Sequence, residues 1–168
     1  MSRSRSILFF VLVFLVQLAI SNFLNLGPWI TISLIPFLIL QIPLQRTPHV
    51  VMLSAFGLGL LLDWLSAGVL GLNAFAALMA AAPRRLLYRL IVNGERQEPL
   101  WIPLLRDTGL LKYLNYLLSL TAIYLAAFIL LDCVSVRPFG FILVKFVVST
   151  LISTLLGLLL AFAFQRRS

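Results

Sequence analysis

One carboxylate, Asp63, stands in the middle of an apolar stretch that covers residues 54–76. Glycines flank it at positions 57, 59, 68 and 71. A carboxylate at a helix centre in hydrocarbon costs roughly 2.5–3.5 kcal/mol, so we expect Asp63 to face protein, water or an interface. Two interpretations are open, and both can hold. Asp63 docks a partner or orients a ligand; alternatively, Asp63 or Ser66 caps the following helix, and the glycines permit the turn.

Few other side chains could do chemistry. The chain has one cysteine, Cys133, one histidine, His49, and five acidic residues. This excludes an internal disulfide, a Cys-rich metal site and a cluster of imidazole ligands. The sequence also lacks a Ser/His/Asp set, paired carboxylates at helical spacing, a phosphate loop and zinc-ligand spacing. We therefore expect no enzymatic activity, no metal and no cofactor.

The composition indicates an integral membrane protein. Of 168 residues, 62% are hydrophobic and 11% are charged, whereas soluble domains have about 45–50% apolar and 25% charged residues. The formal net charge is +8, from 13 basic and 5 acidic residues. In a soluble protein this would suggest nucleic-acid binding, but here the excess of positive charge on cytoplasmic loops is the simpler cause. We expect no nucleic-acid partner.

The hydrophobic pattern predicts an all-α membrane protein, with six transmembrane helices in a compact bundle that forms one domain over residues 1–168. The first apolar run resembles a signal peptide, but further spans follow it, so we expect an uncleaved helix. Pro36 should kink the second helix. A cytoplasmic loop is expected at 89–109. The six predicted helices cover about residues 7–26, 29–44, 50–64, 69–88, 110–131 and 141–164.

The distribution of basic residues predicts that both termini lie in the cytoplasm. With six spans, only Arg137 and Lys145 fall towards the outside, and five spans would leave one terminal arginine pair outside. The remaining basic residues, all on the inner side, are Arg3, Arg5, Arg46, Arg84, Arg85, Arg89, Arg96, Arg106, Lys112, Arg166 and Arg167.

Small residues recur at every fourth position of the last predicted helix: Ser149, Ser153, Gly157 and Ala161. This spacing lays a narrow stripe along one face, where the backbone of another helix can approach closely. The stripe packs either inside its own bundle or against another protein. Lys145, one turn earlier, could extend to the membrane surface or pair with Asp132 or Asp63.

Positive charge is concentrated between residues 84 and 112. Arg84, Arg85 and Arg89 open this region and are predicted to lie at the membrane surface. They could bind anionic lipid headgroups or a cytoplasmic partner. Alternatively, they only determine the orientation of the protein in the lipid bilayer.

The segment from Asp63 to Ala74 resembles the most recognisable part of the rod shape-determining protein MreD family. In that family a Gly-rich helix ends in Asp, and a small residue, Leu-Gly and a further helix follow. The resemblance is specific over residues 56–77 and compositional elsewhere. The matching positions are Gly59, Asp63, Ser66, Gly68, Leu70 and Gly71.

The resemblance implies a non-enzymatic membrane scaffold or regulator of the cell-elongation machinery (the elongasome), located in the bacterial cytoplasmic (inner) membrane. Such a protein is expected to bind MreC and, through it, the MreB filament, RodA and the elongation transpeptidase. It would support side-wall peptidoglycan synthesis and rod cell shape. The implied fold is similar to that of the substrate-binding S components of energy-coupling-factor transporters. An S component is the alternative function, although the first helix carries only Ala19 where S components have a repeated alanine docking motif.

Overall fold

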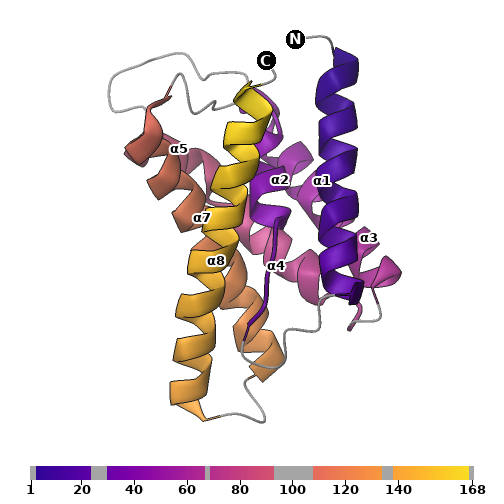
Figure 1. Cartoon of the computed structure of the whole chain (residues 1–168), viewed down its shortest axis with the longest axis vertical. Coiled ribbons are helices and arrows are strands. Elements are labelled where there is room, and N and C mark those ends of the chain that lie inside the picture. The colour runs from indigo at the N-terminus through magenta and orange to yellow at the C-terminus, as the bar shows by residue number, and fades with distance from the viewer. Residues whose placement is uncertain (1–2, 24–29, 67–68, 93–107, 134–137, 167–168) are drawn as a thin grey trace.

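The computed structural model describes residues 3–23, 30–66, 69–92, 108–133 and 138–166. Within these ranges every regular element is helical, which confirms the all-α class. Figure 1 shows the helices gathered side by side, with the start of α1 and the end of α8 at the same end of the molecule. The helices are α1 (Arg3–Phe23), α2 (Ile35–Gln41), α3 (Pro48–Leu65), α4 (Leu72–Ala81), α5 (Arg84–Ile91), α7 (Leu110–Cys133) and α8 (Phe139–Arg166).

Within the described ranges, three helices are long and apolar enough to span a membrane: α3, α7 and α8. Two shorter apolar helices cover residues Ile7–Phe23 and Leu72–Ala81. Large apolar side chains are exposed along the outer faces of most helices. A surface of this kind is stable in lipid, where no water penalises it. The chain is therefore a membrane protein.

The second predicted helix differs most from its expectation. Residues 30–34 are not helical, and α2 covers only Ile35–Gln41, with Pro36 in its first turn. Proline lacks an N–H group, and in a longer helix its ring would collide with the carbonyl of Ile32. Ile42 is extended (ψ 134°) because it precedes Pro43. Pro36 and Pro43 therefore bound a short helix, and Pro36 does not kink a long one.

Proline also divides the predicted helix at 69–88. In the structure α4 ends at Ala81 and α5 begins at Arg84, immediately after Pro83. The remaining helix ends agree with expectation to within a few residues, apart from α1, which begins at Arg3. Most of the predicted loop at 89–109 lies outside the described residues.

The core is built around the segment 30–41, which the other helices surround. Every residue from Ser33 to Leu40 is buried. α3 packs closely against α4, and α7 packs against both α4 and α8. In Figure 1, α2 lies in the middle of the bundle, and α1 stands at its edge. The part of this segment from Ser33 to Leu40 is thus enclosed by protein.

Candidate functional site

Asp63 lies in the last turn of α3, and its side chain caps the N-terminus of α4. The carboxylate is 2% exposed and accepts four hydrogen bonds. Oδ2 accepts from the N–H groups of Gly71 (3.0 Å) and Ala74 (3.1 Å). Oδ1 accepts from the N–H (3.2 Å) and the side-chain Nδ2 (2.7 Å) of Asn73. The first N–H groups of a helix have no partner within it, so an acceptor at this place satisfies them and complements the helix dipole.

The two helices that Asp63 joins approach each other closely. A Cβ atom at Gly59 would lie 2.5 Å from the Cα of Ala74 and 2.6 Å from the carbonyl oxygen of Asn73. Only glycine fits at that distance. Gly71 adopts a left-handed conformation (φ 94°) just before α4, which glycine enters at little cost. The α3–α4 hairpin (residues 48–81) therefore depends on these glycines and on Asp63.

The other residues predicted around Asp63 have lesser roles. Ser66 is half-buried and follows α3; its N–H donates to the carbonyl of Leu62 (2.8 Å), and its side chain makes no capping bond. Leu70 is exposed. Gly68 lies outside the described residues. Of the two alternatives for the cap, the structure places Asp63 there and not Ser66.

Side chains from two distant helices bond the backbone of the central segment. The N–H groups of Thr31 and Ser33 donate to the hydroxyls of Ser149 (2.9 Å) and Ser153 (3.0 Å) on α8. The N–H of Leu34 donates to Oε1 of Gln17 on α1 (2.6 Å). A non-helical backbone inside a membrane protein must be satisfied in this way, because lipid offers no donors or acceptors. No pattern in the sequence marks Gln17 for this role.

The small-residue stripe of α8 faces the interior. Ser149, Ser153, Gly157 and Ala161 are all buried. A Cβ at Gly157 would lie 3.1 Å from a methyl group of Leu117 on α7. Of the two alternatives for the stripe, contact inside the bundle is the one that the structure shows. The serines contribute hydrogen bonds as well as small size.

Two further polar links connect helices. The Tyr124 hydroxyl of α7 donates to Oδ1 of Asn73 on α4. The Nδ2 group of the same Asn73 side chain donates to Oδ1 of Asp63. Lys145, one turn before Ser149, is buried, and its Nζ lies 2.7 Å from Oδ2 of Asp132 at the end of α7. Lys145 therefore pairs with Asp132, one of the alternatives that the sequence left open.

The three arginines predicted at the membrane surface separate in the structure. Arg84 is 2% exposed, and its Nη2 donates to the carbonyls of Leu40 (3.2 Å) and Ile42 at the C-terminus of α2. Arg85 is half-buried and donates from Nη2 to the carbonyls of Leu44 (3.2 Å) and Arg46 (2.6 Å). Arg89 is exposed. A membrane-surface role stays a prediction for Arg89, whereas Arg84 lies inside the protein.

Arg84 remains a cation at the end of α2. The ordinary pKa of arginine is so high that the group keeps its charge in proteins. A positive charge at the carbonyl end of α2 complements the dipole of that helix.

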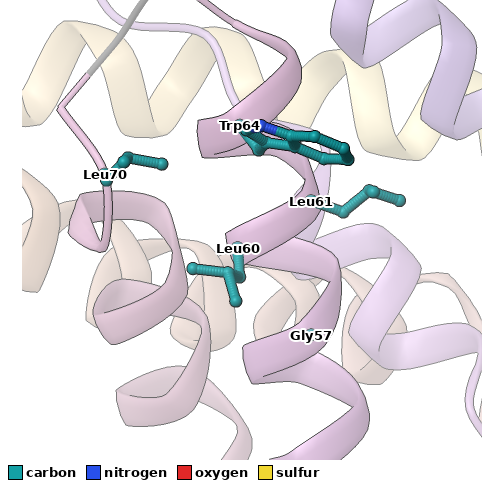
Figure 2. A pocket seen from close by; sticks show the side chains of 5 residues that line it. All are labelled: Gly57, Leu60, Leu61, Trp64 and Leu70. Carbon is teal, nitrogen blue, oxygen red and sulfur yellow. The ribbon is translucent and has the colours of Figure 1, made fainter.

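The outer face of the α3–α4 hairpin carries an apolar groove of about 350 Å³. Figure 2 shows it between the end of α3 and the residue that precedes the first turn of α4. Trp64 is 74% exposed and stands beside it. The groove is lined by Gly57, Leu60, Leu61, Trp64 and Leu70, which all lie within residues 56–77.

Several polar side chains of this core bond to the backbone of other segments of the chain. Both oxygens of Asp63 are occupied by donors of its own chain. Within the described residues, no three His, Cys, Asp or Glu side chains are grouped so that they could hold a metal ion. The arrangement can join α3, α4, α7 and the central segment rigidly. No protein-family model, no curated protein and no solved structure is significantly similar to this chain.

Proposed function

We propose that this protein is a non-enzymatic membrane scaffold of the cell-elongation machinery. It binds an MreC-like membrane protein and so supports side-wall peptidoglycan synthesis and rod cell shape. Through that partner it binds indirectly to the MreB filament, RodA and the elongation transpeptidase. The observation that carries the proposal is the saturation of Asp63 by its own chain. A carboxylate used in this way builds a rigid hairpin, which leaves the outer surface of the hairpin for function.

The proposal includes six membrane crossings, with both termini in the cytoplasm of a bacterial inner membrane. Its support is the common end of the molecule at which α1 begins and α8 ends (Figure 1). Chain segments that begin and finish on one side cross an even number of times. The basic residues of α5 and of the first turn of α7 also fit an inner side. Labelling of cysteines introduced at Ser4 and Ser168 tests this orientation, and a periplasmic signal at either position contradicts it.

One observation favours the alternative, an S component of an energy-coupling-factor transporter. Membrane transporters often bind their substrates at interrupted helices whose backbone groups are free, and residues 30–41 form such an interruption. Here, however, three of the backbone N–H groups are bonded by Gln17, Ser149 and Ser153. The scaffold is therefore the function that the geometry supports better.

Co-purification of the tagged full-length protein with a co-expressed MreC-like protein tests the proposal. We expect the two to purify together, and the groove is the surface at which we expect the transmembrane helix of the partner to bind. A Cβ at Gly57 would meet no atom within 4 Å, so Gly57→Leu should fold and fill the groove. We expect this variant to accumulate normally, and we expect the amount of co-purified MreC-like protein to fall at least tenfold.

Gly140→Leu is the matched control, because a Cβ at Gly140 also meets nothing within 4 Å and Gly140 lies outside the groove. Equal partner recovery from both variants would remove the groove from the proposal. Failure of the unaltered protein to bring down the MreC-like protein would remove the scaffold function itself. Recovery of transporter ATPase subunits in its place would support the S-component alternative.

A further inference from the structure

The orientation of α5 is fixed by its buried side. Arg84 and Tyr88 lie one turn apart and are both buried. Arg84 bonds to the carbonyls at the end of α2, and the Tyr88 ring packs edge-on against Tyr116 of α7, with ring centroids 5.8 Å apart. Leu86 and Leu90 are therefore turned outwards and are 60% and 71% exposed. Arg84 and Tyr88 of α5 thus face the protein, and Leu86 and Leu90 face its surroundings.

A basic residue accompanies the exposed leucines on each of two neighbouring helices. Arg89 is exposed between Leu86 and Leu90, at positions that share one face of a helix. The first turn of α7 exposes Leu111 and Lys112, and Lys112 lies one turn before the Tyr116 that contacts α5. We call these residues the α5–α7 surface: Leu86, Arg89, Leu90, Leu111 and Lys112.

The described residues offer no negative charge to balance this surface. Their two carboxylates are Asp63, which caps α4, and Asp132, which pairs with Lys145. Behind the surface, Arg84 adds a buried positive charge, and its Nε and Nη1 have no hydrogen-bond partner. The N-terminus of α7 contributes the positive end of a 24-residue helix dipole. Among the described residues, the charges at and behind this surface are therefore all positive.

We propose that the α5–α7 surface binds an anionic phospholipid. Its phosphate lies between Arg89 and Lys112, and its acyl chains cover Leu86, Leu90 and Leu111. A free phosphate ion would satisfy the charges but would leave the leucines uncovered, whereas a phospholipid matches both parts. The surface lies at the end of the molecule that holds the start of α1 and the end of α8 (Figure 1), where lipid headgroups meet the protein.

The test uses the full-length protein in neutral detergent without any protein partner, so that its outcome is independent of the proposed scaffold function. Lipid binding is measured by native mass spectrometry and by the shift in melting temperature. The probes are phosphatidylglycerol, phosphatidylcholine with the same acyl chains, and inorganic phosphate. We expect phosphatidylglycerol alone to be retained and to raise the melting temperature. Each basic residue near an anionic lipid contributes about 1 kcal/mol, or roughly fivefold in affinity.

The decisive variant is Arg89→Gln with Lys112→Gln, and the control is Arg3→Gln with Arg5→Gln at the start of α1. We expect the first pair to weaken phosphatidylglycerol binding by about 20-fold and the control to change it little. Both variants should melt as the unaltered protein does in phosphatidylcholine. Equal binding of the two lipids, equal weakening by both variants, or an equal effect of inorganic phosphate would each overturn the proposal. Unchanged lipid binding by the decisive variant would also overturn the proposal. The partner of this surface would then be an acidic protein segment.

Discussion

The α3–α4 hairpin and the central segment 30–41 differ in where they find acceptors for their unpaired backbone N–H groups. Each contains backbone N–H groups that no helix satisfies, and each supplies them with acceptors from side chains. In the hairpin, Asp63 bonds to residues 8 to 11 positions further along the chain. In the central segment, the acceptors lie 17, 118 and 120 positions away. The first arrangement is visible in a short stretch of sequence, and the second is not.

The difference teaches which polar residues of a membrane protein are structural. Asp63 looks functional because a carboxylate is costly in an apolar helix. Ser149 and Ser153 look like spacers because they are small. In the structure all three are acceptors for backbone N–H groups that are buried or partly buried. In lipid an unsatisfied N–H is itself expensive, so polar side chains are retained to satisfy it.

The largest effect is expected for Asp63→Ala. The change leaves the N–H groups of Gly71, Asn73 and Ala74 without their acceptor, and a buried donor without a partner costs about 1–3 kcal/mol. Because Gly71 and Asn73 are only partly buried, we expect a loss of about 3 kcal/mol in the free energy of unfolding in detergent. The free energy of unfolding of Asp63→Asn should lie between those of Asp63→Ala and the unaltered protein. Ser66→Ala is the control and should change little, because the Ser66 side chain makes no capping bond. Normal stability of Asp63→Ala, with a lost partner, would return Asp63 to a role in docking.

A second effect is expected at the closest approach of the two helices of the hairpin. Gly59→Ala places a methyl group 2.5 Å from the Cα of Ala74, so the hairpin must open. Overpacking of this kind costs about 1–3 kcal/mol. Gly57→Ala lies half a turn away, where an added methyl group meets nothing within 4 Å, and it should be neutral or slightly stabilising. Melting temperature and accumulation in the membrane report the comparison. Equal behaviour of the two variants would show that the hairpin is looser than described.

The smallest effect is expected in the central segment. Ser153→Ala removes the acceptor of the buried Ser33 N–H, and we expect a loss of about 1 kcal/mol. Adding Ser149→Ala should about double that loss. Ser54→Ala serves as the control, because the Ser54 hydroxyl bonds only to the carbonyl of Val50 in its own helix. If the double variant melts like the control, the stability of the central segment does not depend on hydrogen bonds to α8. The difference between the hairpin and the central segment would then not hold.

Much of the fold could be predicted from the sequence, because it follows from local composition and periodicity. The apolar runs predicted α3, α7 and α8 almost to their ends, and the glycines and Asp63 predicted a capped turn between α3 and α4. The division at Pro83 and the shortness of α2 were also encoded locally. The length of α2 was wrongly predicted because Pro36 was expected to kink a helix, whereas it lies in the first turn of one. At Pro83 no break was predicted.

The sequence by itself determined that this is a helical membrane protein with Asp63 at a helix junction, because hydrocarbon imposes long apolar runs and penalises an unpaired charge. Only the tertiary structure decided what the polar residues bond to. Gln17, Ser149 and Ser153 meet the central segment, and Arg84 turns inwards to α2, only when distant helices come together. No local pattern marks such pairs, because a hydrogen bond depends on distance in space, and the bundle sets that distance.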